Sequence, residues 1–215
     1  GGEFSLQADH AFQSILAGDV LGTTSDIKQQ NPLSSTPQPG TFQSFCLEKD
    51  EHLYTGASYS VTISNQANGG GQNTNFGDPI SIGTAYLYSH FNRGSLSGYQ
   101  YGTESQRETS AAALQHAIWY LENEETYADA GGASNIFLNA VLTQFGSLEN
   151  ADDDSNGAYG IKVASLWVPG HEGDLSYARQ DQLIATPIPA AVWLLASGLI
   201  GLTAFRRRQV NGSGC

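Results

Sequence analysis

The sequence predicts an α+β fold in which a β-rich domain, of the sandwich or barrel kind, carries a small group of helices. Two observations support this class. Strand-like segments come first, helix-like segments follow and strand-like segments return, which differs from the regular alternation of βαβ units. Charged residues are only 14% of the 215, whereas Gly contributes 25 residues and Tyr 10, a composition typical of β-rich extracellular domains. We expect residues 1–185 to form this domain.

Two segments near the start of the chain are predicted strands, residues 1–7 and 41–49. In the second, side chains alternate between two faces, so Cys46 points away from its neighbour Phe45. Residues 22–40 are rich in Thr, Ser, Gln and Pro, which favours a loop between the two strands.

Three more strands are predicted, over residues 57–64, 158–168 and 181–185. Residues 65–77 are expected to form a long loop after the first of these. Strict alternation in that strand places three side chains towards the core, those of Tyr59, Val61 and Ile63.

Three helices are predicted between the strands. The first takes Asp78 as its N-cap and Pro79 as its first-turn residue. The second begins near residues 109–110, and its helical period separates two sets of side chains. The apolar stripe comprises Leu114, Ala117, Ile118 and Leu121, and the side expected to face solvent comprises Glu122, Glu124 and Glu125.

The third predicted helix is bounded by a serine cap at Ser134 and a terminal glycine at Gly146. Its period predicts one apolar face towards the core. That face comprises Ile136, Phe137, Val141, Leu142 and Phe145.

Residues 186–209 differ in character from the rest of the chain. The run from Ala190 to Phe205 is uncharged and largely apolar, and as a helix it would span roughly 24 Å, a little less than a bilayer core. A buried core helix is the alternative, and it is disfavoured because the run has no polar face. Prolines break any helix arriving from upstream, and arginines close the run; these residues are Pro187, Pro189, Arg206, Arg207 and Arg208.

This order of features resembles the PEP-CTERM sorting signal of Gram-negative bacteria, in the variant that begins with a VPLPA-like string. The string here is TPIPA, with Thr186 and Ile188 substituted. In that family a membrane protease, exosortase, cleaves near the prolines. The resemblance implies export behind a removed leader, transient anchoring in the inner membrane by a transmembrane sorting helix, and release to the cell surface or extracellular matrix. Residues 210–215 are left as a tail.

Composition and motifs also argue against several functions. The formal net charge of −12 disfavours a nucleic-acid partner, because phosphates require basic patches. The five histidines show no metal-ligand spacing, and no nucleophile elbow, P-loop or dinucleotide fingerprint occurs. The sequence therefore predicts a protein that is not an enzyme and needs no cofactor.

A short acidic segment invites comparison with calcium loops. Asp152, Asp154 and Asn156 occupy alternate positions before Gly157. An EF-hand needs a bidentate glutamate at the twelfth position, which is Val163 here. A solvated acidic turn is therefore favoured over a calcium site.

Cys46 is the only cysteine before Cys215, and Gln115 borders the apolar stripe of the second helix. A glutamine in that position faces a strand that bears an inward cysteine. If the two side chains meet, the thiolate displaces ammonia from the amide and leaves a thioester. This step needs proximity and a water-poor pocket, and the candidate walls are Phe42, Phe45, Ile118 and Trp119.

The strings FCLE (45–48) and LQHAIW (114–119) resemble the thioester domains of bacterial surface adhesins. Those domains carry an aromatic-Cys-aliphatic-acidic string and a T-Q-x-A-I-W string, and Leu114 departs from the second. The resemblance covers residues 40–125. It implies a thioester between Cys46 and Gln115 that a partner amine attacks to form an amide.

Two neighbours of the pair are candidates for proton transfer during that reaction. His116 is the possible proton shuttle and Glu48 the possible base. A half-exposed histidine and a solvated carboxylate are the simpler interpretations. The partner would be an amine or hydroxyl of a protein or polysaccharide.

The alternatives are equally concrete. Cys46 is then a small buried hydrophobic residue and Gln115 a packing residue, or Cys46 pairs with Cys215 or with another molecule in an oxidising compartment. The protein would then be a structural subunit of an extracellular matrix or filament, able to self-assemble. Abundant Tyr, Gly and Asn favour that alternative.

Overall fold

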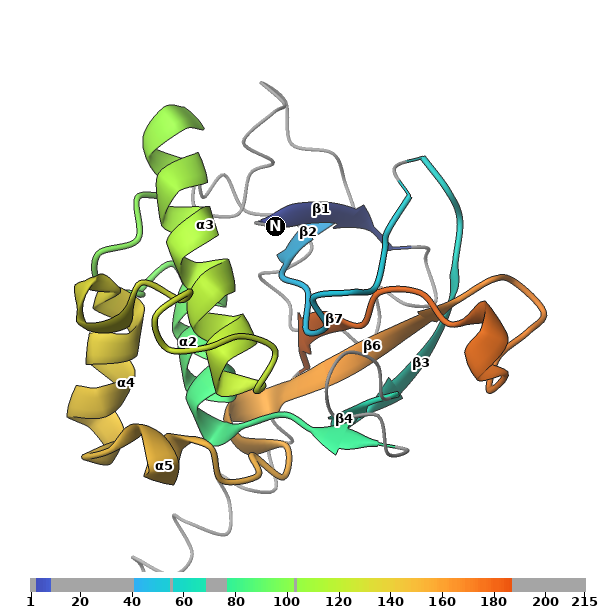
Figure 1. Cartoon of the computed structure of the whole chain (residues 1–215). Helices are drawn as coiled ribbons and strands as arrows, with labels where there is room; N and C mark the ends of the chain where they lie inside the picture. Colours follow the sequence, from blue (N-terminus) through green and yellow to red (C-terminus); the bar gives the residue numbers. More distant parts are fainter. Residues whose placement is uncertain (1–2, 9–40, 55, 69–76, 103, 187–215) are drawn as a thin grey trace, which may run out of the picture.

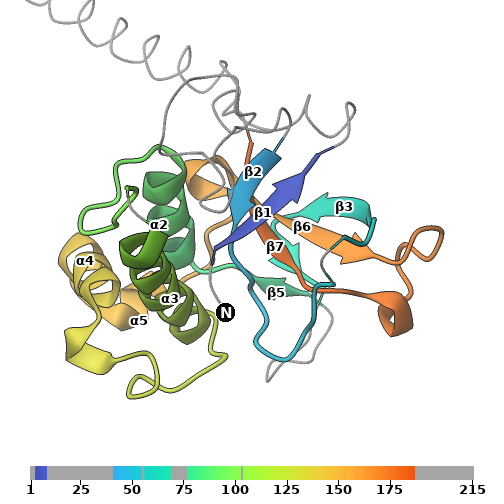
Figure 2. The same ribbon diagram turned by 90° about the horizontal axis from the view of Figure 1, so that it is seen from above.

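Helices and strands occupy different sides of the molecule. The computed structural model describes residues 3–8, 41–54, 56–68, 77–102 and 104–186. The helices gather on the left of Figure 1 and the strands on the right, and the view from above shows the same division (Figure 2). Because the two kinds of element are segregated rather than alternating, the predicted α+β class is confirmed.

The strands of the described residues form three antiparallel sheets. The largest places β6 (Ile161–Trp167) between β3 (Ser60–Ser64) and β7 (Gln182–Ala185). The two smaller sheets pair β1 (Phe4–Gln7) with β2 (Thr41–Ser44) and β4 (Gln66–Ala67) with β5 (Asp78–Pro79). Every predicted strand therefore has a counterpart, although the strand predicted over residues 41–49 ends at Ser44 and the one predicted over 158–168 begins at Ile161. β4, which lies within the predicted loop 65–77, and β5 are additional.

Four α-helices and three short 3₁₀ helices are present in the described residues. The α-helices are α2 (Ile82–Asn92), α3 (Glu104–Leu121), α4 (Ile136–Phe145) and α5 (Leu148–Ala151). The 3₁₀ helices are η3 (Gly132–Ser134), η4 (Ala158–Gly160) and η5 (Leu175–Tyr177). None of the described helices is long and apolar enough to cross a membrane. The sorting helix predicted at residues 190–205 and its flanking prolines and arginines lie outside the described residues.

The start of α2 differs from the prediction. Asp78 and Pro79 form strand β5, which pairs with Gln66 and Ala67 of β4. The N-cap of α2 is Ser81, whose side chain accepts a hydrogen bond from the Thr84 N–H. Sheet pairing therefore takes precedence over the local helix signal of an Asp-Pro pair.

The apolar stripe of α3 is confirmed, but the predicted side facing solvent is wrong. The four stripe residues are at most 1% exposed. Glu122 and Glu124 are 6% and 3% exposed, and the Glu125 side chain is 1% exposed. The helix ends at Leu121, so the helical period does not extend to these glutamates, and the chain folds inwards after it. The helix also begins at Glu104, earlier than predicted.

Helix α4 is rotated relative to the predicted face. Phe137, Leu138 and Val141 are its buried residues, whereas Ile136 and Leu142 are 50% and 44% exposed. The N-cap is Asn135 rather than the predicted serine, because Ser134 belongs to η3. The predicted terminal glycine, Gly146, does cap the helix at a φ of 80°.

Replacement of Asn135 by alanine is expected to destabilise the fold by about 2–3 kcal/mol. The buried Asn135 amide caps α4 by accepting from the backbone of residues 137 and 138, and its Nδ2 donates to the carbonyls of Ala113 and Ala130, both at 2.9 Å. Urea unfolding measures the loss. Asn139→Ala is the control, because the side chain of the exposed Asn139 donates to a single carbonyl among the described residues, that of Ala133; equal effects of the two changes would contradict the bridging role of Asn135.

An ion pair fastens the amino-terminal segment to α3. Arg107 donates to Glu3 through Nε at 2.8 Å and through Nη2, and the Tyr99 hydroxyl donates to the same carboxylate at 2.7 Å. The Arg107 and Glu3 side chains are 3% and 2% exposed. The pair thus joins segments that are more than a hundred residues apart in sequence.

Candidate functional site

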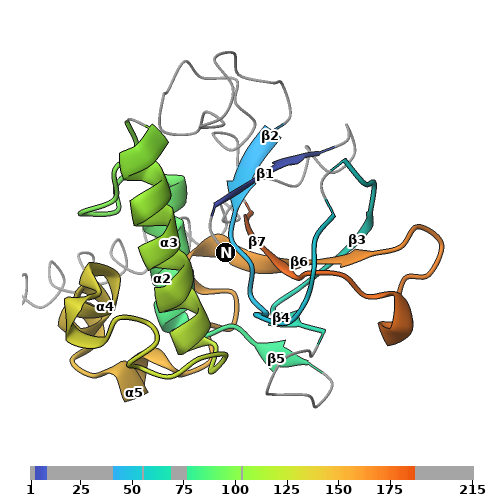
Figure 3. The ribbon, with the colours of Figure 1, turned by 45° about the horizontal axis from the view of Figure 1, so that its top comes forward.

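Cys46 lies just beyond β2, where the chain continues alongside β7 (Figure 3). Backbone hydrogen bonds on both sides of it, from Leu47 to Asp181 at 3.1 Å and from Leu183 to Phe45 at 3.2 Å, hold Cys46 opposite Gln182. Cys46 is 4% exposed and forms no disulfide among the described residues. The predicted wall residues Phe42, Phe45, Ile118 and Trp119 are all buried.

Gln115 meets Cys46 directly. The glutamine lies in α3 with no exposed surface. Its Oε1 accepts a hydrogen bond from the Cys46 N–H at 3.1 Å, and its Nε2 donates to the Cys46 carbonyl at 2.7 Å. The structure therefore brings together the two residues predicted as a pair, with the amide held against the cysteine backbone.

Gln182 is a third member of the site, and the sequence analysis did not identify it. Its Nε2 donates to the Cys46 Sγ at 3.4 Å, while its Oε1 is buried and has no hydrogen-bond partner. Gln182 itself is 0% exposed. The available signal was a glutamine at the start of the otherwise apolar strand QLIA.

Burial controls the protonation of the Cys46 thiol. Desolvation raises its pKa to about 11, although the hydrogen bond from Gln182 opposes the shift. Because the thiolate is the reactive form of cysteine, a free Cys46 in this fold is a neutral, slow nucleophile at pH 7.

Four carboxyl groups surround the chain that follows Cys46. Burial raises the pKa of Glu48 to about 9, with a further increase from the charge of Glu124, and burial and Asp181 raise the pKa of Glu51 to about 7. Burial also raises the pKa of Asp181 to about 6. Glu48 is only 2% exposed, so it is not the solvated carboxylate of the simpler interpretation, and its raised pKa favours the protonated form at neutral pH. Its role as a base stays a prediction.

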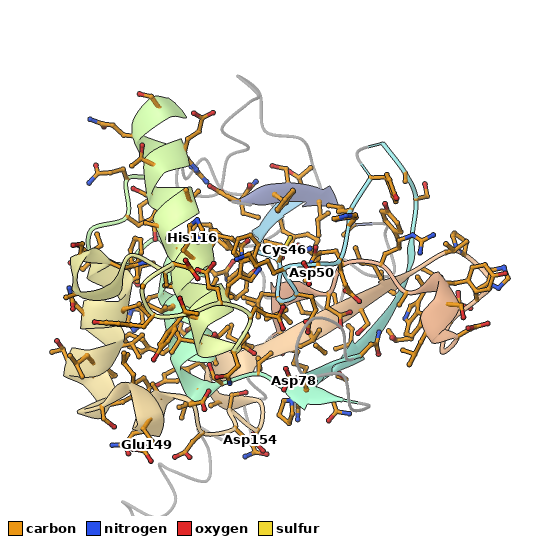
Figure 4. The ribbon with its side chains drawn as sticks, in the orientation of Figure 1. Cys46, Asp50, Asp78, His116, Glu149 and Asp154 are labelled. Atoms are coloured by element: carbon orange, nitrogen blue, oxygen red, sulfur yellow. The ribbon has the colours of Figure 1, made fainter. Side chains whose placement is uncertain are left out.

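His116 follows Gln115 on α3 and is labelled in Figure 4. Its Nδ1 lies 2.8 Å from Glu125 Oε1, its ring packs against Trp119, and its side chain is 43% exposed. It also lines a hollow of about 400 Å³ shared with η3 and the start of α4. These contacts match the half-exposed histidine of the simpler interpretation, and the shuttle role stays a prediction.

The acidic turn is remote from this site. Figure 4 shows Asp154 at the lower end of the molecule, well separated from Cys46. The Asp152 carboxylate accepts from Asn123, and the Asn156 amide donates to the Asp154 carbonyl. No three His, Cys, Asp or Glu side chains gather as metal ligands in the part of the chain that the structure describes. The solvated turn remains the favoured interpretation.

Comparisons with family models, curated proteins and solved structures found no match. Function is therefore argued from the site. A buried cysteine held against a buried glutamine amide can do one specific piece of chemistry. The sulfur can replace the amide nitrogen on Gln115, which converts a stable side chain into an acyl donor.

Proposed function

We propose that this chain is a secreted surface protein, an adhesin, that carries an internal thioester between Cys46 and Gln115. The paired hydrogen bonds between the Gln115 amide and the Cys46 backbone carry the proposal. Together they fix the orientation of the amide, so formation of the bond requires little loss of conformational freedom. We also propose that the strand region of the domain is of the sandwich or barrel kind.

Formation of the thioester is balanced without any co-reactant. The Cys46 sulfur bonds to the side-chain carbonyl carbon of Gln115, the carbon–nitrogen bond breaks, and the thiol proton leaves with the nitrogen as ammonia. The Cys46 N–H already donates to the carbonyl oxygen. It therefore stabilises negative charge on that oxygen in the tetrahedral intermediate.

The loaded thioester acts when a partner surface presents an amine or a hydroxyl. The nucleophile bonds to the Gln115 carbonyl carbon, Cys46 leaves, and the partner becomes covalently attached to α3. Burial of Cys46 and Gln115 protects the bond from water until then. Residues 186–209 would act as a transient inner-membrane anchor and sorting signal, which exosortase cleaves to release the domain to the cell surface or matrix.

The intact mass of the purified domain tests the proposal. We expect the mass to be lower than the calculated value by one ammonia, and to increase by one methylamine after treatment with that amine. Gln115→Ala and Cys46→Ala are expected to show their calculated masses before and after treatment. Gln180→Ala is the matched control, since Gln180 is also buried and donates to the Glu48 carbonyl, and it should keep the mass deficit.

The calculated mass together with a titratable free thiol would contradict the proposal. The structural-subunit alternative would then predict assembly that depends on protein concentration and is indifferent to Cys46→Ala. Sedimentation velocity over a range of protein concentrations measures that assembly.

A further inference from the structure

The side-chain amide of Gln182, next to Cys46 of the reactive pair, has one group with a hydrogen-bond partner and one without. Its Nε2 reaches the Cys46 sulfur, whereas its Oε1 is buried without a partner. A buried acceptor that lacks a donor is costly, and native structures keep few of them. Ten buried side-chain atoms of the described residues lack a partner, and the Gln182 oxygen is the one whose own amide nitrogen contacts the Cys46 sulfur. It is therefore placed to accept a hydrogen bond from a group that approaches the reactive pair.

The position of this side chain is set by the backbone on both sides. Cys46 and Gln182 face each other as an isolated antiparallel bridge, and the flanking hydrogen bonds join residues 47 to 181 and 183 to 45. Gln182 also pairs through its backbone with Ala164 in β6. The backbone of Gln182 is therefore held from two sides, and the hydrogen bond of 3.4 Å from Nε2 to Sγ places the side-chain amide against the sulfur.

We propose that Gln182 is the specificity-determining residue of the thioester: its Nε2 holds the sulfur, and its Oε1 accepts a hydrogen bond from the nucleophile that attacks Gln115. This inference rests on the proposed function. It narrows the partner from an amine or a hydroxyl to a primary amine.

The selection follows from counting hydrogens during the reaction. A primary amine loses one hydrogen when its nitrogen bonds to the Gln115 carbon, and the amide that forms keeps one N–H. An alcohol loses its single O–H, and the ester has none. The proton that leaves the nucleophile is taken up by the Cys46 thiolate as the carbon–sulfur bond breaks. Only the primary amine can therefore satisfy Gln182 Oε1 throughout the reaction.

Three small nucleophiles of nearly equal size test whether selection depends on the hydrogen that remains on the attacking atom. Ethylamine and dimethylamine contain the same atoms, but only ethylamine keeps an N–H after acylation, and ethanol keeps no O–H. Rates of adduct formation are measured by intact mass and divided by the rates with a free peptide thioester in solution. We expect the wild-type protein to favour ethylamine over both other nucleophiles by about tenfold or more relative to that reference.

Gln182→Leu removes the acceptor and is expected to reduce this preference to within about twofold of the reference. Loss of the sulfur contact slows all three reactions alike, so it cancels from the ratio. Gln180→Leu, a buried glutamine two residues earlier, should keep the wild-type ratio. If Gln182→Leu does not fold or does not form the thioester, the comparison of the isomeric amines on the wild-type protein still decides the question.

The outcomes separate this inference from the proposed function. A wild-type protein that forms the thioester but shows the reference ratio, or a Gln182→Leu variant that keeps the wild-type preference, overturns the role of Gln182 alone. A wild-type protein with no mass deficit overturns both proposals.

Discussion

Arg107→Ala is expected to lower the free energy of unfolding by about 3–5 kcal/mol, the largest effect that we predict for a single substitution. Among the described residues, the change leaves the buried Glu3 carboxylate with the Tyr99 hydroxyl as its remaining donor. A buried charge without its counter-charge is much more costly than the intact pair is stabilising. Chemical denaturation monitored by the three tryptophans of the chain measures the loss.

Two further variants separate the buried charge from ordinary truncation. Arg93→Ala shortens an exposed arginine and should change the stability by less than about 0.5 kcal/mol. Glu3→Gln combined with Arg107→Met removes both charges and keeps an acceptor for Tyr99, so it should recover more than half of the loss. A cost below about 1 kcal/mol for Arg107→Ala would show that the pair is not buried in solution.

The second large effect concerns pH. The pKa of Glu48 is raised in the folded state to about 9, from an ordinary value of 4.5, by burial and by the charge of Glu124. The folded protein then binds more protons than the unfolded chain between these values, so the associated stability is complete below about pH 4.5 and is lost as pH rises towards 9. Wild-type protein should therefore lose roughly 2–4 kcal/mol more than Glu48→Gln between pH 5 and pH 8.

Denaturation of both proteins at the two pH values measures this difference. Glutamine resembles the protonated carboxyl in shape and does not titrate, so Glu48→Gln should be the more stable protein at pH 8. Glu149→Gln is the control, because Glu149 is exposed in α5 and its substitution should leave the wild-type pH dependence intact. Parallel pH profiles for wild type and Glu48→Gln would show that Glu48 is ionised in the fold.

The sequence predicts most of the elements because their local signals agree with their packing. The stripe of α3 reports burial directly, and the structure confirms it. The alternation around Val61 and Ile63 is confirmed in part, because both side chains pack against the core but are only partly buried. Local signals fail where a distant segment competes for the same backbone. Asp78 and Pro79 resemble a helix start, yet they pair with Gln66 and Ala67, and no pattern within the helix region contains that information.

Part of the candidate site follows from the sequence in the same way. Gln115 borders an apolar stripe, and the strand predicted over residues 41–49 contains Cys46, so a contact between helix and sheet could be predicted, although β2 itself ends at Ser44. Gln182 could not be predicted, because its contact with Cys46 depends on how the last strand pairs. The burial of Glu48 and Glu124 was also missed, since sequence patterns treat a carboxylate as solvated unless a partner is visible.

The position of Gln115 in the chain also has a mechanical consequence. If the chain after β7, which ends at Ala185, stays attached to the cell surface, tension on a captured partner enters at Gln115 on α3 and leaves through that chain. Attack on the thioester also breaks the covalent crosslink between α3 and the strand region, so only non-covalent contacts then resist the applied force. The segment from Gln115 to Ala185 can unfold under force, and its fully extended length would be at most about 250 Å. Covalent capture of a partner would thus allow the domain to unfold and lengthen under force while the partner stays attached.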